Sequence, residues 1–243
     1  LEELCERDFD PSTMRTFKRG VDTSLFHFDP DRYQEMADEA PLRGGFNLVW
    51  SGRVCRDKNL AYLFDLYQEL VRQYPETNLF IVGDGPSYQE YRQMMERHER
   101  VVFTGRIPHH QTARWYCRGD LLVFPSTMDT FGMAVVEAQA CGCPALVTDV
   151  GGPQEIVTAG WTGYALSLEE RDRWLDRIAL FIRYKARHPQ GYLDMRRRIS
   201  EAILERYSLN GSLNDIIGYR AEKALQAGRM RPTFRPATAE TAR

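Results

Sequence analysis

Short apolar runs rich in β-branched and aromatic residues alternate with segments of helical periodicity between Phe46 and Leu166. This alternation is typical of a parallel β-sheet whose strands are joined by crossover helices. Each run is bounded by glycine, proline or a charged turn. The strands predicted in this way cover residues 46–51, 78–83, 100–105, 120–125 and 144–149.

The clearest helix is predicted between the first two strands, because apolar side chains recur there every three or four residues and describe one buried face. These side chains are Leu60, Leu63, Phe64, Tyr67, Leu70 and Val71. Later crossover helices are expected at 86–97, 109–117 and 132–141. Five strands and four helices predict a single α/β domain, a Rossmann-like, doubly wound parallel sheet covering residues 18–166.

Strand signals stop after Leu168, and helical periodicity continues. Apolar side chains at helical spacing predict helices within 174–182, 193–207 and 213–225. We expect this helical C-terminal region, residues 167–225, to pack on the sheet. Residues 226–243 are polar with few apolar anchors, which predicts a flexible tail.

The charge balance excludes some classes of partner. The chain has 32 Lys and Arg against 34 Asp and Glu, and a net charge of -2 gives no field that favours nucleic acid or anionic lipid.

Five cysteines without CxxC spacing indicate reduced thiols in a cytoplasmic protein. No run approaches the roughly 18 apolar residues of a membrane span, and the acidic first residues do not resemble a signal peptide.

Ligands of open parallel sheets bind outside the carboxyl ends of the strands, so the loops after the strands carry the functional candidates. Gly52 and Arg53 follow the first strand and Lys58 begins the next helix, which places two cations where a diphosphate could lie. A solvated turn with a surface lysine explains the same residues. Gly83 and Gly85 follow the second strand and would let a ligand approach the backbone closely, or simply form a turn.

The segment after the fourth strand contains two carboxylates, Asp129 and Glu137, eight positions apart. On a helix this spacing is roughly 12 Å, comparable to the distance from a sugar ring to the ribose of its nucleotide. The amides of Phe131, Gly132 and Met133 at the helix start suit a diphosphate. For Asp129 the alternative is a plain helix N-cap.

Glu137 is the only charged residue from Thr130 to Val147. An unpaired carboxylate in such an apolar run is costly, and two adjacent ribose hydroxyls would offset that cost. The alternative is a carboxylate that happens to lie on the helix surface.

Gly151-Gly152-Pro153 after the fifth strand allows tight packing under a ligand or forms an ordinary turn.

These residues together resemble the donor-binding domain of family 4 glycosyltransferases of the GT-B fold. The similar motifs follow one another in the family's order from about Lys18 to Tyr164. They are Arg19-Gly20-Val21-Asp22 with Phe26, Gly52-Arg53, Lys58-Asn59, Gly83-Asp84-Gly85-Pro86, Phe103-Thr104-Gly105-Arg106, the segment 125–144 with its two acidic residues, and Gly151-Gly152-Pro153.

The resemblance implies a role for each candidate. Arg53 and Lys58 would neutralise the diphosphate, Glu137 would hold the ribose, and Asp129 would face the transferred sugar. Arg106 and Ile107 would border the nucleobase, and Gly52, Gly83, Gly85 and the amides of Phe131, Gly132 and Met133 would complete the donor site. The family usually has Glu where this chain has Asp129, which puts the donor sugar or the rate in question.

The implied reaction is the retaining transfer of a hexose from a nucleoside diphosphate sugar, of the GDP-mannose or UDP-sugar type, to a lipid or glycan hydroxyl. The resemblance implies no metal and no cofactor. The acceptor and any peripheral membrane contact would belong to an N-terminal domain that precedes this chain, with residues 1–17 as the lead-in from it. We therefore expect the isolated chain to bind nucleotide and to transfer nothing.

Other functions fit parts of the pattern. A donor domain in which Asp129 no longer supports turnover would be a catalytically silent nucleotide-sugar-binding module. A nucleotide-sugar epimerase or a phosphorylase of GT-B architecture is a second alternative, disfavoured by the two cations followed by paired carboxylates. A dehydrogenase is disfavoured because Tyr88 stands where the GxGxxG fingerprint needs its third glycine.

Overall fold

The computed structural model describes residues 19–31, 33 and 44–226. The lead-in expected at 1–17 and, apart from Gln226, the tail expected at 226–243 lie outside the described residues. The described residues fall into two compact units, one within Val21–Arg206 and a smaller one that contains residues 19–20 and 207–226. Within the smaller unit, Gly20 packs so closely on Leu209 that a Cβ atom at Gly20 would lie 2.3 Å from the Leu209 Cα.

The larger unit is built on a six-stranded parallel sheet with the order β3-β2-β1-β4-β5-β6. Strands β1, β2, β4 and β5 are buried along their whole length, as continuous apolar runs covered on both faces are expected to be. The strands are β1 (Phe46–Ser51), β2 (Thr77–Val82), β3 (Val101–Gly105), β4 (Leu121–Phe124), β5 (Ala145–Thr148) and β6 (Gly163–Leu166).

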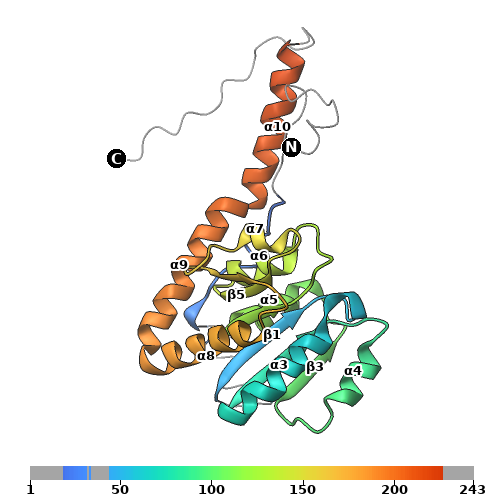
Figure 1. Ribbon diagram of the computed structural model, residues 1–243. Coiled ribbons are helices and arrows are strands. Elements are labelled where there is room, and N and C mark those ends of the chain that lie inside the picture. The colour runs from blue at the N-terminus through green and yellow to red at the C-terminus, as the bar shows by residue number, and fades with distance from the viewer. Residues whose placement is uncertain (1–18, 32, 34–43, 227–243) are drawn as a thin grey trace. The chain divides into compact units, whose positions relative to one another are not determined.

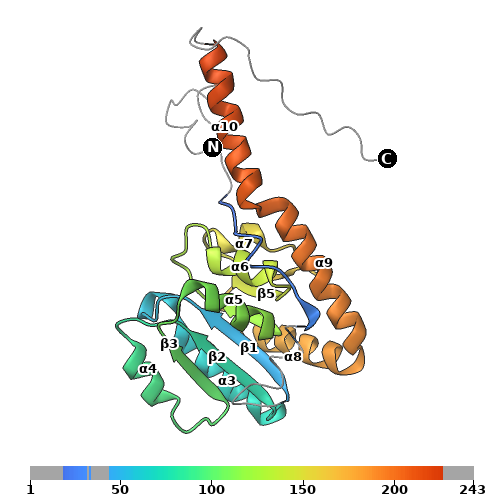
Figure 2. The same ribbon diagram turned by 180° about the vertical axis from the view of Figure 1, so that it is seen from behind.

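Helices cover both faces of this sheet (Figure 1). Helix α3 packs on α8 on one face, and α5 packs on α6 on the other, which Figure 2 shows from behind. The described helices of the larger unit are η2 (Arg56–Lys58), α3 (Leu60–Gln73), α4 (Tyr88–Met94), α5 (His109–Arg118), α6 (Met133–Ala140), α7 (Pro153–Ile156), α8 (Arg171–Arg187) and α9 (Pro189–Tyr207), and α10 (Leu209–Gln226) belongs to the smaller unit. None of the described helices is long and apolar enough to span a membrane.

The predicted fold class, a doubly wound parallel sheet with a helical C-terminal region, is confirmed. The prediction of five strands was wrong, because β6 adds a sixth at the edge beside β5. Its four residues begin with a glycine and give too short a pattern to separate from a loop. Helices α9 and α10 begin four residues earlier than predicted, because their first turns contain proline, glycine and polar residues that the sequence pattern assigned to loops.

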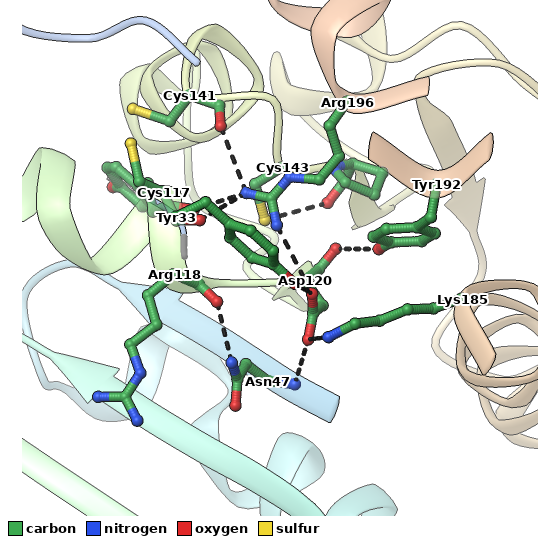
Figure 3. A network of polar contacts seen from close by, with 12 residues as sticks. Tyr33, Asn47, Cys117, Arg118, Asp120, Cys141, Cys143, Lys185, Tyr192 and Arg196 are labelled. Carbon is green, nitrogen blue, oxygen red and sulfur yellow. Dashed lines mark hydrogen bonds and ion pairs between the residues drawn. The ribbon is translucent and has the colours of Figure 1, made fainter. Parts of the chain in front are cut away.

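A buried polar network joins α8 and α9 to the amino ends of the strands (Figure 3). Asp120, directly before β4, is fully buried and accepts hydrogen bonds from the Lys185 Nζ at 2.7 Å and the Asn47 backbone N–H at 2.8 Å. The Arg196 Nη1 lies 3.5 Å from its carboxylate, and the Arg196 guanidinium covers the Tyr33 ring at 4.4 Å. One carboxylate therefore faces two cations at the amino ends of the strands, opposite the predicted site.

Candidate functional site

The strand order places the reversal of the sheet between β1 and β4, which is where open α/β sheets form their ligand crevice. The loops after these two strands meet. The Lys58 Nζ donates to both carboxylate oxygens of Asp129, each at 2.8 Å, and both side chains are about one-fifth exposed. Two of the predicted site residues, 71 positions apart in the sequence, are thus an ion pair at the switch point.

Asn59 fixes the geometry of the first of these loops. It has φ 53° and is the only non-glycine residue with a positive φ in the described part of the chain. Its side-chain Nδ2 donates to the Pro125 carbonyl oxygen at 3.0 Å, directly after β4. A left-handed conformation costs about 1–2 kcal/mol for most residues, and this hydrogen bond between the loops holds Asn59 in it.

A cavity of about 460 Å³ opens beside this switch point, at the carboxyl ends of β1, β2 and β3. It brings together six of the predicted donor-site residues, namely Gly52, Arg53, Gly83, Gly85, Arg106 and Ile107, with Ser51, Val82, Asp84, Pro86 and Thr112. The guanidinium groups of Arg53 and Arg106 come from different loops. The cavity therefore has two cations and several backbone amides in its wall.

The two glycines after β2 are required first by the packing of the chain on itself. A Cβ atom at Gly83, where φ is 132°, would lie 2.0 Å from the Gly52 carbonyl oxygen. A Cβ atom at Gly85 would lie 2.3 Å from the Val54 carbonyl oxygen. Both glycines also line the cavity. The packing accounts for them as a turn, and their role in binding a ligand stays a prediction.

The start of α6 lies next to the Lys58–Asp129 pair. Gly132 is the N-cap, with φ 96°, and no side chain caps this helix. The alternative interpretation of Asp129 as an N-cap was therefore wrong, because its carboxylate faces Lys58. The Asp129 carbonyl oxygen accepts a hydrogen bond from the Gly152 N–H at 2.9 Å, so the Gly151-Gly152-Pro153 turn after β5 supports this loop. Phe131, Gly132 and Met133 form the segment that opens the helix.

Glu137 points from α6 toward α5 and is only 8% exposed. Its Oε1 lies 2.9 Å from the His109 Nε2, and its Oε2 accepts a long hydrogen bond of 3.5 Å from the Tyr116 hydroxyl. Burial raises the pKa of Glu137 above its ordinary value, and the hydrogen bond and charge of His109 oppose that rise. The nearby Ser51, which lines the cavity, lowers the pKa of Tyr116, against the larger rise that burial causes.

Arg53 and Lys58 both follow β1, and Glu137 contacts the first residue of α5, which follows β3. That these three residues bind one ligand stays a prediction. Lys58, Asp129, Phe131, Gly132, Met133 and Glu137 are not among the residues that line the cavity, but they lie on the elements beside it. Sequence reasoning missed His109 and Tyr116. Their signal would have been the packing of α5 on α6, which no local pattern encodes.

Known proteins place this geometry in a family. The family model of glycosyl transferases group 1 matches residues 33–206. The chain belongs to this family. A GDP-mannose-dependent alpha-mannosyltransferase of Corynebacterium glutamicum is 28% identical over 204 residues, which are 78% of this chain and 47% of that protein. A D-inositol 3-phosphate glycosyltransferase of Catenulispora acidiphila is 32% identical over 195 residues, 73% of this chain and 45% of that protein.

Solved structures agree on the fold. HepE of Anabaena, solved in complex with UDP, superposes with a TM-score of 0.75 at 19% identity, covering 91% of this chain and 61% of that one. The C-terminal domain of the group 1 glycosyl transferase LpcC of Francisella tularensis gives a TM-score of 0.65 at 21% identity and is covered completely by 78% of this chain. The fold is that of one half of a GT-B glycosyltransferase. The chain spans about half the length of the two curated relatives.

Proposed function

We propose that this chain is the donor-binding domain of a retaining glycosyltransferase that moves a hexose from a nucleoside diphosphate sugar to a lipid or glycan hydroxyl. The observation that carries the proposal is the meeting of Lys58 and Asp129 at the switch point, beside the cavity that holds Arg53. The cavity wall contains Arg53, and the Lys58–Asp129 ion pair and the start of α6 lie on elements beside it. That combination suits an anionic diphosphate.

The diphosphate would lie between Arg53, Lys58 and the amides that open α6. Charge builds on the diphosphate as the glycosidic bond breaks, and fixed cations and helix amides stabilise it without reorganisation. Arg and Lys contribute differently, since the guanidinium offers a planar fork and the ammonium a point charge. We propose that the reaction needs no metal and no cofactor.

The sugar would lie at Asp129 and the nucleoside at the opposite end of the crevice. Asp129 is held by Lys58 through both of its oxygens, so its position relative to the diphosphate site is fixed. Glu137 offers a buried carboxylate for the two ribose hydroxyls, and Arg106 and Ile107 would border the base. Retention would follow from attack on the same face of the sugar, with no enzyme nucleophile.

The donor base and the acceptor belong to the proposal as well. A GDP-mannose or UDP-sugar donor fits the names of the relatives, which include a GDP-mannose-dependent mannosyltransferase. Because those relatives are about twice as long as this chain, we assign the acceptor site and any peripheral membrane contact to the other half of a two-domain enzyme. This chain alone should bind nucleotide and transfer no sugar.

Isothermal titration with UDP, GDP and ADP tests the proposal directly. We expect one of them to bind, with a loss of about tenfold or more in Lys58→Ala and Glu137→Ala, because a hydrogen bond to a charged group contributes about 1.5–3 kcal/mol. The exposed residues Arg72 and Glu201 provide matched controls, as Arg72→Ala and Glu201→Ala. Absence of binding by all three nucleotides, or equal binding by all four variants, contradicts the proposal.

A catalytically silent nucleotide-sugar-binding module is the second candidate. It is favoured by Asp129, whose carboxylate is one methylene shorter than the family's usual Glu. The two candidates differ in turnover and not in binding. A full-length protein that binds a nucleotide sugar without consuming it in the presence of acceptors would be the silent module. Restoration of consumption by Asp129→Glu would locate the cause. An epimerase of GT-B architecture would instead convert the sugar nucleotide without any acceptor.

A further inference from the structure

The Glu137 carboxylate is held by two side chains of α5, one on each oxygen. His109 lies 2.9 Å from Oε1, and the Tyr116 hydroxyl lies 3.5 Å from Oε2. An ionised carboxylate has about four acceptor directions, two for each oxygen. After the contacts from α5, each oxygen keeps one direction. This is the number that two neighbouring hydroxyl groups require.

His109 reaches the buried carboxylate from the segment between β3 and α5, part of which lines the cavity. It is the first residue of α5, two positions after Ile107, and Thr112 one turn later lines the cavity. Its side chain is 67% exposed, whereas that of Glu137 is 10% exposed. The His109 ring also packs against Phe26 at 5.1 Å between centroids, which limits the directions it can take.

We propose that His109 is a positioning residue for nucleotide binding, whose ring N–H holds the Glu137 carboxylate so that both of its oxygens face the 2′- and 3′-hydroxyls of a ribose. The proposal rests on the proposed function and adds to it a residue outside the expected donor motif. His109 acts through Glu137. Its removal should therefore affect only ligands that carry the two hydroxyls.

The pH dependence of binding gives a second readout. The titratable groups around Glu137 are His109 and Tyr116 of α5, and Asp22 acts electrostatically on His109 from the loop before. Burial raises the pKa of Glu137 and also raises that of Tyr116 well above its usual value, so Tyr116 stays protonated. His109 lowers the pKa of Glu137, so without it that pKa rises further. Since the ionised carboxylate binds the diol, the acid limb of the affinity profile should move to higher pH.

The experiment compares ribonucleotides with their 2′,3′-dideoxy counterparts by calorimetry from about pH 5 to pH 8, a range that spans the usual histidine pKa. UDP and GDP are each paired with the dideoxy form, and the pair that binds the wild-type chain more tightly is used. We expect His109→Ala to weaken the ribonucleotide about tenfold and to leave the dideoxynucleotide unchanged. Its acid limb should move upward in pH.

Two further variants control for structure. His109→Gln keeps an N–H donor near the same place and should restore most of the affinity at pH 8, which also covers the case in which the alanine variant folds poorly. His110→Ala removes the neighbouring exposed histidine and should change nothing. A structural role for His109 would weaken both ligands equally, without a shift of the acid limb, and would overturn the inference.

Failure of the inference is distinguishable from failure of the proposed function. If Glu137→Ala binds the ribonucleotide as tightly as the wild type, the carboxylate does not hold a ribose, and the proposed role of Glu137 is wrong. If Glu137→Ala loses the preference for the ribonucleotide while His109→Ala keeps it, only the role of His109 is wrong.

Discussion

Asp120→Asn tests whether a single buried carboxylate holds α8 and α9 on the sheet. The side chain of Asp120 is fully buried, and two cations, Lys185 and Arg196, face it. The Tyr33 hydroxyl donates to its Oδ1 at 2.9 Å and the Asn47 N–H to its Oδ2 at 2.8 Å. All four groups act as donors, so an amide NH2 in place of either oxygen meets a donor. The substitution also leaves both cations without a counter-charge.

The expected cost follows from the loss of one partner in a buried ionic contact, which is about 3–5 kcal/mol. Arg196 is completely buried and cannot reach water to compensate, whereas Lys185 is one-quarter exposed and can do so in part. With a shift of about 2–4 °C for each kcal/mol in a domain of this size, the melting temperature should fall by roughly 6–20 °C.

Thermal and urea denaturation of the wild-type and Asp120→Asn chains measure this loss of stability directly. The urea midpoint should fall with little change in the slope m, because the surface exposed on unfolding is the same. Asp65→Asn, at an exposed position of α3, should stay within about 0.5 kcal/mol of the wild type. An Asp120→Asn chain within about 1 kcal/mol of the wild type would refute the reasoning, since it would mean that neither cation depends on this carboxylate.

Three further predictions concern the rim of the site. Glu137→Gln should stabilise the nucleotide-free chain at neutral and alkaline pH. Burial raises the pKa of Glu137, so the ionised carboxylate destabilises the native state. This destabilisation begins as the pH rises through the ordinary pKa of 4.5 and is complete above the raised pKa of the native state. Melting curves from pH 4 to pH 8 that show no growing difference would contradict it. Gly83→Ala should lower the free energy of unfolding by at least about 2 kcal/mol, because φ is positive at this position and the added Cβ atom would meet the Gly52 carbonyl oxygen. Gly218 in α10 has open space around it, so Gly218→Ala should leave the free energy of unfolding unchanged or raise it. Urea titrations measure both variants. Asn59→Val should lower both stability and nucleotide affinity, because a β-branched residue disfavours φ 53° and cannot make the hydrogen bond to the Pro125 carbonyl oxygen. Asn59→Gly should lose only that hydrogen bond. Equal stability of the two variants would refute the role of the left-handed turn.

The local patterns of the sequence determined most of the elements. Nearly continuous apolar runs predicted β1, β2, β4 and β5 to within about two residues, because strands buried on both faces have apolar side chains at most positions. Helix α3 followed from its single buried face. The order of glycines, cations and carboxylates after the strands indicated the family, and a parallel sheet brings such loops to one edge.

Only the tertiary structure decided which polar groups meet. Lys58 and Asp129 are neighbours because β1 and β4 are adjacent in the sheet, and strand order is not written in the periodicity of either segment. The pairing of Glu137 with His109 depends on how α5 and α6 pack on each other, and that of Asp120 with Lys185 depends on where α8 lies against the amino end of β4. Apolar burial is set residue by residue along the chain, whereas the partner of a buried charge is a property of distant segments brought together.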